Sequence, residues 1–277
     1  MPEGPEIRRA ADRLEKAIAH QPTTAVFFAF EHLKPFEEKL AGRAVAAIET
    51  FGKAMVTRFD NEICVYSHNQ LYGLWMVRSA HDYPPTKRQL RFAIHTGKKS
   101  ALLYSASDIA VLYADEVPHH PFIRNLGPDV LKPTTTEATV LEQITSTRFR
   151  RKSLSSLLLD QRFLCGIGNY LRSEILFVAR THPTLRPMDC SEVQIEGLVK
   201  GAIAIPRQSY QHNGITNDLA LAARLKAEGL ARREYRHWVF GRETQPCYIC
   251  GTPIIKAISG GRRYYYCPTC QPLSPHR

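Results

Sequence analysis

The sequence lacks any long apolar run. Its 277 residues contain no stretch near the about 18 consecutive apolar residues that a membrane-spanning helix needs. The first residues, MPEGPEIRRAADRLEK, are too polar for a secretory signal peptide. The sequence also has no internal repeat and no low-complexity tract. We therefore expect a cytoplasmic protein that has no membrane partner.

Acidic residues are scarce relative to basic ones. The chain has 26 Asp and Glu residues against 37 Lys and Arg residues, which gives a net charge of +11 and a pI near 9.4. This excess favours a polyanionic partner such as nucleic acid, although many basic proteins bind none. The length permits two domains, or three if one of them is small and is held by a metal or by disulfides.

Cysteines are few and unevenly placed. Three of the seven, Cys64, Cys165 and Cys190, are isolated, and we interpret them as buried or incidental thiols. The other four form two C-x-x-C pairs with sixteen residues between them, a spacing typical of a tetrahedral zinc site. In a reducing compartment such pairs hold metal more often than they form disulfides; the alternatives are a redox pair or unliganded thiols. The predicted ligands are Cys247, Cys250, Cys267 and Cys270.

Four thiolate ligands leave a zinc ion no open coordination position. The sequence therefore predicts one structural Zn²⁺ per chain, and catalysis must lie elsewhere. Between the two pairs, TPIIKAISGGRRYYY is typical of two short strands around a turn at Ser259-Gly260-Gly261. The result is a zinc-held β-hairpin with Arg262 at its tip, where this arginine is a candidate phosphate contact.

The first part of the chain is predicted to be an antiparallel β-sandwich with one helix. Apolar residues at helical spacing indicate an amphipathic helix from Glu3 to about His20. Strand-like runs follow, and T-G-K-K marks a hairpin turn between the strands at Ile94 and Leu102. These runs are VAAIETF, MVTRF, EICVYSH, LRFAIHT, SALLYSA and IAVLY. We expect a domain boundary near residue 126, after which the periodicity changes.

Helical periodicity runs from about Glu137 to Gln208. Two apolar helical stretches flank a break at Cys165-Gly-Ile-Gly168, and Asn169 stands where the second helix opens. Glycines at such a turn let backbone N–H groups approach a phosphate, and Asn169 would add a side-chain donor. The ordinary alternative is a helix hairpin with an asparagine cap. The following stretch, 209–243, is polar, and we expect it to be irregular.

The N-terminus offers an amine nucleophile. Removal of Met1 would expose Pro2 as a secondary amine, whereas a retained Met1 would leave it in an amide. An α-amine with a pKa of about 7.8 is partly free base at neutral pH, unlike a lysine with a pKa of about 10.4. The adjacent Glu3 can move protons, and a cation at Lys53 would lower the pKa of the Pro2 amine. Amine attack on a sugar carbon gives an iminium ion, from which the phosphates of that sugar can be eliminated.

Each of these residues also has a purely structural interpretation. Pro2 can simply start a helix, Glu3 and Glu6 can complement the helix dipole, and Lys53 can be a solvated turn lysine. The combination of motifs is more specific than its parts.

Four stretches, in order along nearly the whole chain, resemble the formamidopyrimidine-DNA glycosylase and endonuclease VIII family. They are MPEGPE at the start, FGKA around Lys53, LLLDQRFLCGIGNYLRSEIL in the middle, and the four-cysteine hairpin with GGRR. By this resemblance Pro2 is the Schiff-base nucleophile, Glu3 the general acid and base, and Lys53 a catalytic lysine near the sugar and phosphates. The helical break is then similar to the family's helix-two-turns-helix element.

The resemblance also extends to DNA contacts. Asn169 and Arg262 match phosphate-binding positions of the family, and Glu6 matches a position on the lesion side. The stretch SHNQLYG looks like the endonuclease VIII branch, whose Gln-Leu-Tyr trio enters the space left by an everted nucleotide. Gln70 can hydrogen-bond the widowed base, and Leu71 and Tyr72 can wedge into the duplex. The alternative for these three is an apolar strand-to-turn corner.

The resemblance implies an α+β multidomain fold. It comprises an N-terminal antiparallel β-sandwich with an N-terminal helix (1–125), a helix-two-turns-helix DNA-binding domain (126–222), and a linker with a C-terminal zinc β-hairpin (223–277). Two features depart from the family pattern: Cys165 and Ile167 stand in the helix-turn segment, and QPLSPHR follows the hairpin.

The function implied is that of a bifunctional DNA glycosylase and AP lyase of base excision repair. It would excise oxidised pyrimidines from double-stranded DNA through a Pro2 Schiff base, followed by β,δ-elimination. We expect a monomer that binds damaged DNA and that is found at the nucleoid when bound. The alternatives are an oxidised-purine glycosylase of the same family, or a catalytically silent zinc-hairpin DNA-binding protein.

Overall fold

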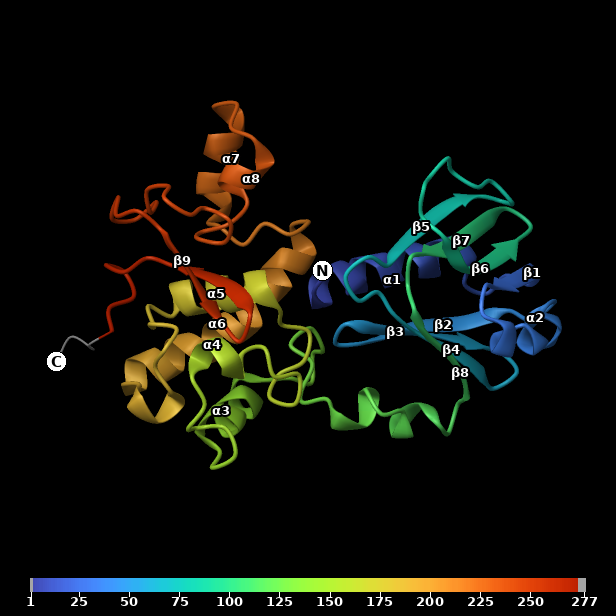
Figure 1. The fold of residues 1–277 in the computed structure, drawn as a ribbon, viewed down its shortest axis with the longest axis horizontal. Coiled ribbons are helices and arrows are strands. Elements are labelled where there is room, and N and C mark those ends of the chain that lie inside the picture. The colour runs from blue at the N-terminus through green and yellow to red at the C-terminus, as the bar shows by residue number, and fades with distance from the viewer. Residues whose placement is uncertain (1, 274–277) are drawn as a thin grey trace. The chain divides into compact units, whose positions relative to one another are not determined.

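The computed structural model describes residues 2–273, and the chain divides after Asn125 into two compact units with separate cores (Figure 1). Within the described residues, no helix combines the length and the apolar character needed to cross a bilayer.

The N-terminal unit is a β-sandwich. Its strands are β1 (Thr23–Phe28), β2 (Val45–Phe51), β3 (Ala54–Phe59), β4 (Ile63–His68), β5 (Leu74–Ser79), β6 (Leu90–Thr96), β7 (Lys99–Tyr104) and β8 (Asp108–Tyr113). One antiparallel sheet has the order β1-β6-β7-β5 and the other the order β2-β3-β4-β8. Its helical segments are α1 (Gly4–Ile18), α2 (Pro35–Leu40), and the short 3₁₀ turns η1 (Glu31–Leu33), η2 (Val117–His119) and η3 (Ile123–Asn125).

Helix α1 is held against the sandwich by its apolar face. Ile7, Leu14 and Ile18 are buried at helical spacing, and they share one core with Phe92 of the first sheet and Val65 of the second. Figure 1 shows α1 running alongside the strands of this unit. This packing fixes the position of the residues that precede the helix.

Strand register brings three loops to one end of the second sheet. Ala54 pairs with His68, and His68 in turn pairs with Asp108. Because neighbouring strands are antiparallel, the β2–β3 turn, the exit from β4 and the entry to β8 lie together. Lys53 is in that turn, and Gln70 follows the exit from β4.

The second unit is helical and ends in a β-hairpin. Its elements are α3 (Glu137–Thr145), α4 (Leu154–Leu157), α5 (Asn169–Val178), η4 (Pro187–Asp189), α6 (Glu192–Gln211), α7 (Leu219–Ala227), α8 (Arg232–Tyr235), β9 (Ile255–Ser259) and β10 (Arg262–Tyr266). Helix α5 packs on α6 and also on β10 (Figure 1). A small core around Phe177, Val239, Ile254 and Tyr265 joins the hairpin to the end of α5.

The sandwich, the helical segment, the break before Asn169 and the hairpin are confirmed, and other expectations need correction. Strands β1 and β5 and helix α2 were not predicted. The stretch 209–243 is not irregular, because it contains α7 and α8. Helix α7 has only nine residues, and a satellite core around Ala222, Leu225 and Tyr235 stabilises it. The first apolar stretch before the break forms only the four-residue α4.

Candidate active site and nucleic-acid interface

The start of α1 positions the acidic residues that follow Pro2. The Glu3 carbonyl accepts the N–H groups of Glu6 and Ile7 at 3.0 and 3.1 Å. In return, the Glu6 carboxylate accepts the Glu3 N–H at 3.1 Å and pairs with Arg9 at 2.7 Å. Glu6 therefore satisfies a donor that helix initiation leaves open, as in a capping box. Glu3 is only 3% exposed, so its side chain is shielded from bulk water directly beside Pro2.

Lys53 lies in the two-residue turn between β2 and β3. Gly52 precedes it with a φ of +59°, the conformation that a type II′ turn requires at its first central position. The lysine is 5% exposed, and lysine is almost never fully buried unless it is paired. Burial lowers the pKa of the neighbouring His68; the carboxylate of Asp108 opposes this shift and the Lys53 ammonium adds to it. Lys53 is thus a buried cation close to the exit from β4.

The loop from β4 to β5 projects two large apolar side chains into solvent. Leu71 and Tyr72 are 62% and 70% exposed. The base of the loop is closed by the Gly73 N–H, which donates to the Asn69 carbonyl at 2.7 Å. A Cβ atom at Gly73 would lie 2.6 Å from the Asn69 backbone, so only glycine allows this closure. We call residues 70–72 the wedge.

Hydrogen bonds hold the wedge in place. The Gln70 N–H donates to Nδ1 of His68 at 3.0 Å, and the Ser107 hydroxyl donates to Gln70 Oε1 at 2.8 Å. An Arg88 N–H donates to the Tyr72 carbonyl at 2.6 Å. A fixed backbone with exposed apolar tips suits insertion between stacked bases.

A cavity of about 300 Å³ opens beside Pro2. Glu6 from α1 lines it, and so do Asn69 and Gly73 from the base of the wedge loop. The structure therefore brings three predicted features of the N-terminal unit to one cavity: the nucleophile, the lesion-side glutamate and the loop that carries the wedge.

In the second unit, Arg172 connects two predicted phosphate contacts. This α5 residue is fully buried, and one of its N–H groups donates to the Ser155 carbonyl at 2.6 Å. Its Nη2 donates to the Arg263 carbonyl at 2.9 Å, and it also lies 3.4 Å from Asn169 Oδ1 and 3.5 Å from the Arg262 carbonyl oxygen. Asn169 and the hairpin turn at Arg262 are thus held together by Arg172, a residue that belongs to none of the predicted site residues.

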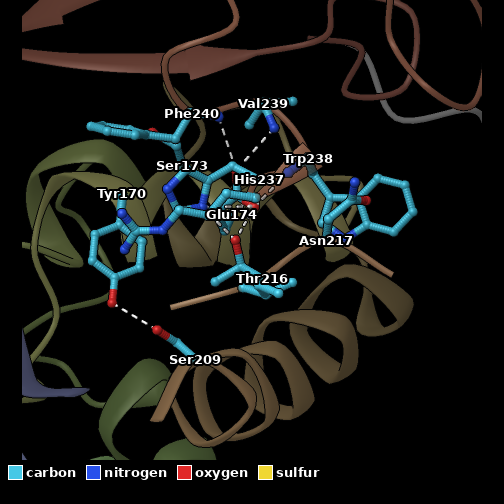
Figure 2. A network of polar contacts seen from close by, with 12 residues as sticks. Tyr170, Ser173, Glu174, Ser209, Thr216, Asn217, His237, Trp238, Val239 and Phe240 are labelled. Carbon is cyan, nitrogen blue, oxygen red and sulfur yellow. Dashed lines mark hydrogen bonds and ion pairs between the residues drawn. The ribbon is translucent and has the colours of Figure 1, made fainter. Parts of the chain in front are cut away.

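Glu174, two residues after Arg172 on α5, binds the segment that leads into the hairpin (Figure 2). Its carboxylate is fully buried and accepts the N–H groups of Trp238, Val239 and Phe240 at 2.8 to 2.9 Å. It also accepts the Thr216 hydroxyl at 2.6 Å. Burial raises the pKa of Glu174, and these four donors oppose the shift.

The signal for these supporting residues was present in the sequence. Arg172, Ser173 and Glu174 interrupt an otherwise apolar helical run, and Ser173 accepts the Tyr265 N–H of the hairpin at 3.1 Å. Three consecutive buried polar residues on a helix are unusual unless each has a partner.

The hairpin turn exposes its arginine. Ser259 pairs with Arg262 across a two-residue turn, and Gly260 and Gly261 have φ values of +54° and +72°. Two consecutive positive φ angles define a type I′ turn, which explains the glycine pair. Arg262 is exposed and therefore available to a phosphate.

The four cysteine sulfurs of the second unit converge. All lie within 4.8 Å of one another, with Sγ–Sγ separations of 3.4 Å for Cys250–Cys267, 3.5 Å for Cys250–Cys270 and 3.8 Å for Cys247–Cys270. Zinc–sulfur bonds of about 2.3 Å in a tetrahedron require separations of about 3.8 Å. The backbone N–H of Cys270 points at Cys267 Sγ at 3.4 Å, which stabilises a thiolate. The donor set therefore fits one zinc ion.

Three family models match this chain. The Formamidopyrimidine-DNA glycosylase N-terminal domain matches residues 1–107, and the Formamidopyrimidine-DNA glycosylase H2TH domain matches residues 126–219. The zinc finger found in FPG and IleRS matches residues 245–273.

Curated relatives match over the full length. Endonuclease 8 of Escherichia coli (strain K12 / DH10B) is 45% identical over 271 residues, which cover 98% of this chain and 100% of the relative. Endonuclease 8 of Shigella sonnei is 44% identical with the same coverage. The chain belongs to the formamidopyrimidine-DNA glycosylase and endonuclease VIII family.

Solved structures of this family share the fold. The chain superimposes with a TM-score of 0.80 on Lactococcus lactis Fpg in complex with DNA that contains N7-benzyl-Fapy-dG. The sequence identity is 22%, and the superposition covers 98% of this chain and 100% of the other. A complex of the same protein with abasic-site DNA also gives 0.80, at 21% identity, covering 98% of this chain and 99% of the other.

Membership of the formamidopyrimidine-DNA glycosylase and endonuclease VIII family confirms the predicted class of activity. The chain is a DNA glycosylase with AP lyase activity that acts on DNA in base excision repair, and it carries one structural zinc. The predicted catalytic and wedge residues all lie in the N-terminal unit, whereas Asn169, Arg262 and the zinc cysteines lie in the second.

Proposed function

We propose that the chain excises oxidised pyrimidines with the amine of Pro2 as its nucleophile, once Met1 is removed. The nitrogen attacks C1′ of the damaged nucleotide, the bond from C1′ to the base breaks, and the base leaves with a proton. The amine loses its proton as the sugar ring opens to an iminium ion. Loss of sugar protons then expels the 3′ and the 5′ phosphates in turn, and water releases Pro2.

In this proposal the shielded carboxyl of Glu3 carries the protons, and Lys53 has two effects. Its positive charge lowers the pKa of the Pro2 amine and attracts the phosphates of the same nucleotide. Burial of Glu3 and Lys53 supports these roles, because acid–base groups act more strongly in a site that excludes water. The observation that carries the proposal is the cavity shared by Pro2, Glu6 and the base of the wedge loop.

We propose that the wedge fills the space that the everted nucleotide leaves. Leu71 and Tyr72 would stack within the duplex and offset the few kcal/mol that flipping costs, and Gln70 would hydrogen-bond the widowed base. Asn169 and Arg262 would bind phosphates, and Glu6 would face the lesion. The preference for pyrimidines is supported by the 45% identity to Endonuclease 8 and by the Gln-Leu-Tyr wedge itself.

Borohydride trapping tests the nucleophile. The same chain is prepared with an N-terminal tag and after a cleavage that leaves Pro2 first, and each form is mixed with a duplex containing an abasic site. We expect a covalent adduct, mapped to Pro2 by mass spectrometry, only for the cleaved form. An adduct of equal yield with the tag in place, or one on Lys53, would refute the assignment.

The lesion class is tested with matched duplexes that contain thymine glycol or 8-oxoguanine. We expect faster single-turnover excision of thymine glycol. Faster release of 8-oxoguanine would show that the chain is selective for purines.

We also propose that the protein works as a monomer in the cytoplasm, without a membrane partner, and associates with the nucleoid when bound to DNA. The four zinc-binding thiols suit a reducing compartment. Light scattering should give one chain per particle, and cell fractionation should recover the protein with soluble material and with DNA.

A further inference from the structure

The first residue of the wedge, Gln70, has a strained backbone. Its φ is +49°, in the left-handed region that residues other than glycine rarely adopt. Such a conformation costs free energy and persists only where neighbouring contacts hold it. The Gln70 N–H donates to His68 Nδ1 at 3.0 Å, and the Ser107 hydroxyl donates to Gln70 Oε1 at 2.8 Å. These two contacts hold the residue from which Leu71 and Tyr72 continue into solvent.

The hydrogen bond from Gln70 fixes the protonation state of His68. A backbone N–H can only donate, so Nδ1 of the histidine must be an acceptor that carries no proton. The ring is therefore neutral and has its proton on Nε2. It also packs edge-on against Phe122, with the ring centroids 5.1 Å apart, and this contact orients the ring. The loop that carries the wedge thus depends on a neutral histidine.

Two charged groups act on His68 from the neighbouring strands. Ala54, the residue after Lys53, pairs with His68 on one side, and Asp108 pairs with it on the other. Burial has the largest effect on His68 and lowers its pKa. The Asp108 carboxylate opposes this shift, and the Lys53 ammonium adds to it. The buried cation of the catalytic turn therefore helps to keep the histidine neutral.

Two further titratable groups belong to the same cluster of rings. Tyr66 donates to Asp108 at 3.4 Å, and its ring centroid lies 6.3 Å from that of Phe122. The ring of His120 packs on Tyr66 at 4.0 Å. Burial raises the pKa of Tyr66 and lowers the pKa of His120, although Asp108 opposes the shift of His120. Both groups are therefore uncharged near neutral pH.

Two other turns of the chain have the same local hydrogen bond. Nδ1 of His120 accepts the Phe122 N–H, and Nδ1 of His182 accepts the Thr184 N–H, each at 3.3 Å. Neither Phe122 nor Thr184 has a positive φ, so these two turns hold ordinary backbone. The turn at His68 differs because it holds a strained residue directly before two exposed apolar side chains.

We propose that His68 is a positioning residue, which holds the wedge in the conformation that enters the duplex, and that protonation of its ring releases the wedge. This inference rests on the function proposed above for the wedge. A protonated ring has a hydrogen on Nδ1 that would face the Gln70 N–H, and two donors cannot bond to each other. Gln70 would lose a contact that holds its backbone, and Leu71 and Tyr72 would lose their fixed direction.

The direction of the pH dependence follows from the same contacts. Because the pKa of His68 is lowered in the folded protein, its ring is neutral at neutral pH. It gains a proton only as the pH falls below about 6.5, the usual pKa of histidine. The wedge should therefore be held at neutral pH and released on the acidic side.

The test follows the wedge on a duplex that cannot react. It contains a tetrahydrofuran analogue of an abasic site, which has no base to release and forms no Schiff base. 2-Aminopurine stands opposite the analogue, and its fluorescence changes when side chains enter the stack beside it. We expect the wild-type signal to be present at neutral pH and to be lost with a midpoint below about pH 6.5.

Two substitutions at His68 separate the acceptor from the titration. His68→Asn places an amide oxygen near the position of Nδ1, and this acceptor does not titrate, so the signal should persist to about pH 5. His68→Leu removes the acceptor, and the equilibrium constant for insertion should fall about tenfold at neutral pH. The matched control is His182→Leu, which removes the same acceptor from a turn of the second unit and should follow the wild-type curve.

Two outcomes of this experiment would overturn the inference. One is a His68→Asn variant that loses the signal at the same pH as the wild-type protein, because the titrating group would then be another one. The other is a His68→Leu variant that inserts the wedge as well as the wild-type protein does.

NMR of the free protein separates this inference from the proposed function. The ring nitrogens of His68 should show the Nε2–H tautomer, and the Gln70 amide should shift with pH at the midpoint of His68. An Nδ1–H tautomer, or a Gln70 amide that does not follow the histidine, would also overturn the inference. If the wild-type protein gave no 2-aminopurine signal at any pH, the function of the wedge would be refuted instead, and NMR would still decide whether His68 holds Gln70.

Discussion

Replacing Glu174 with glutamine probes the polar network of Figure 2 without changing its shape. In the wild-type protein, Oε1 accepts the N–H groups of Val239 and Phe240, and Oε2 accepts the Thr216 hydroxyl and the Trp238 N–H. The glutamine oxygen can serve one of these sets, but its NH₂ group would face the other donors. If the NH₂ group faces the two donors that bind Oε2, the Thr216 hydroxyl can rotate and accept a hydrogen bond from it. The Trp238 N–H cannot rotate, so it loses its acceptor.

The magnitude follows from these contacts. One orphaned buried donor costs about 1–3 kcal/mol, and the remaining bonds lose their charge assistance, which is about half of their strength. Removing the charge also removes its desolvation cost, which offsets part of the loss. We expect Glu174→Gln to lower the free energy of unfolding of the second unit by about 2–4 kcal/mol. At about 2–4 °C per kcal/mol, the Tm of that unit should fall by roughly 5–15 °C.

Calorimetry and hydrogen exchange measure this effect. The thermal transition of the second unit gives the stability, and exchange at the amides of residues 238–240 shows whether the local contacts are lost. The control is Glu196→Gln, which removes the same charge from an exposed i,i+4 pair with Lys200 and should leave the thermal transition nearly unchanged. If the two variants were equally stable and exchange at 238–240 stayed slow, the assigned role of Glu174 would be wrong.

Three further predictions concern the second unit. In the Arg172→Lys variant, the lysine cannot reach the Ser155 and Arg263 carbonyls together. DNA affinity, measured by fluorescence anisotropy, should therefore fall about tenfold, while metal analysis still finds one zinc per chain. Unchanged affinity would contradict this. Removal of zinc with a chelator should abolish DNA binding and the folding of the hairpin but leave the transition of the N-terminal unit intact, as calorimetry would show. Burial lowers the pKa of His237 in the folded protein. As the pH falls below about 6.5, this histidine is therefore protonated in the unfolded state before it is protonated in the folded state. The free energy of unfolding should then drop by up to about 1.4 kcal/mol per pH unit. His237→Phe should flatten that slope in urea unfolding between roughly pH 7 and pH 5, and an unchanged slope would exclude His237 as its source.

Local patterns in the sequence determined much of this protein. The spacing of the four cysteines predicts the metal site, because two thiolates separated by two residues can reach one ion whatever the surrounding fold. The glycine pair before Arg262 predicts its turn, because positive φ angles are a property of the residue itself. The apolar period after Glu3 predicts α1, and MPEGPE with FGKA indicates the family.

Tertiary structure decided what depends on contacts between distant segments. Nothing local to Arg172 shows that it holds the turn at Arg262, which lies ninety residues further on. Helix α7 depends on Tyr235 and its neighbours, since nine residues are too few for a stable isolated helix. A sequence pattern reports how a segment can fold, whereas the tertiary structure determines which polar groups of distant segments become partners.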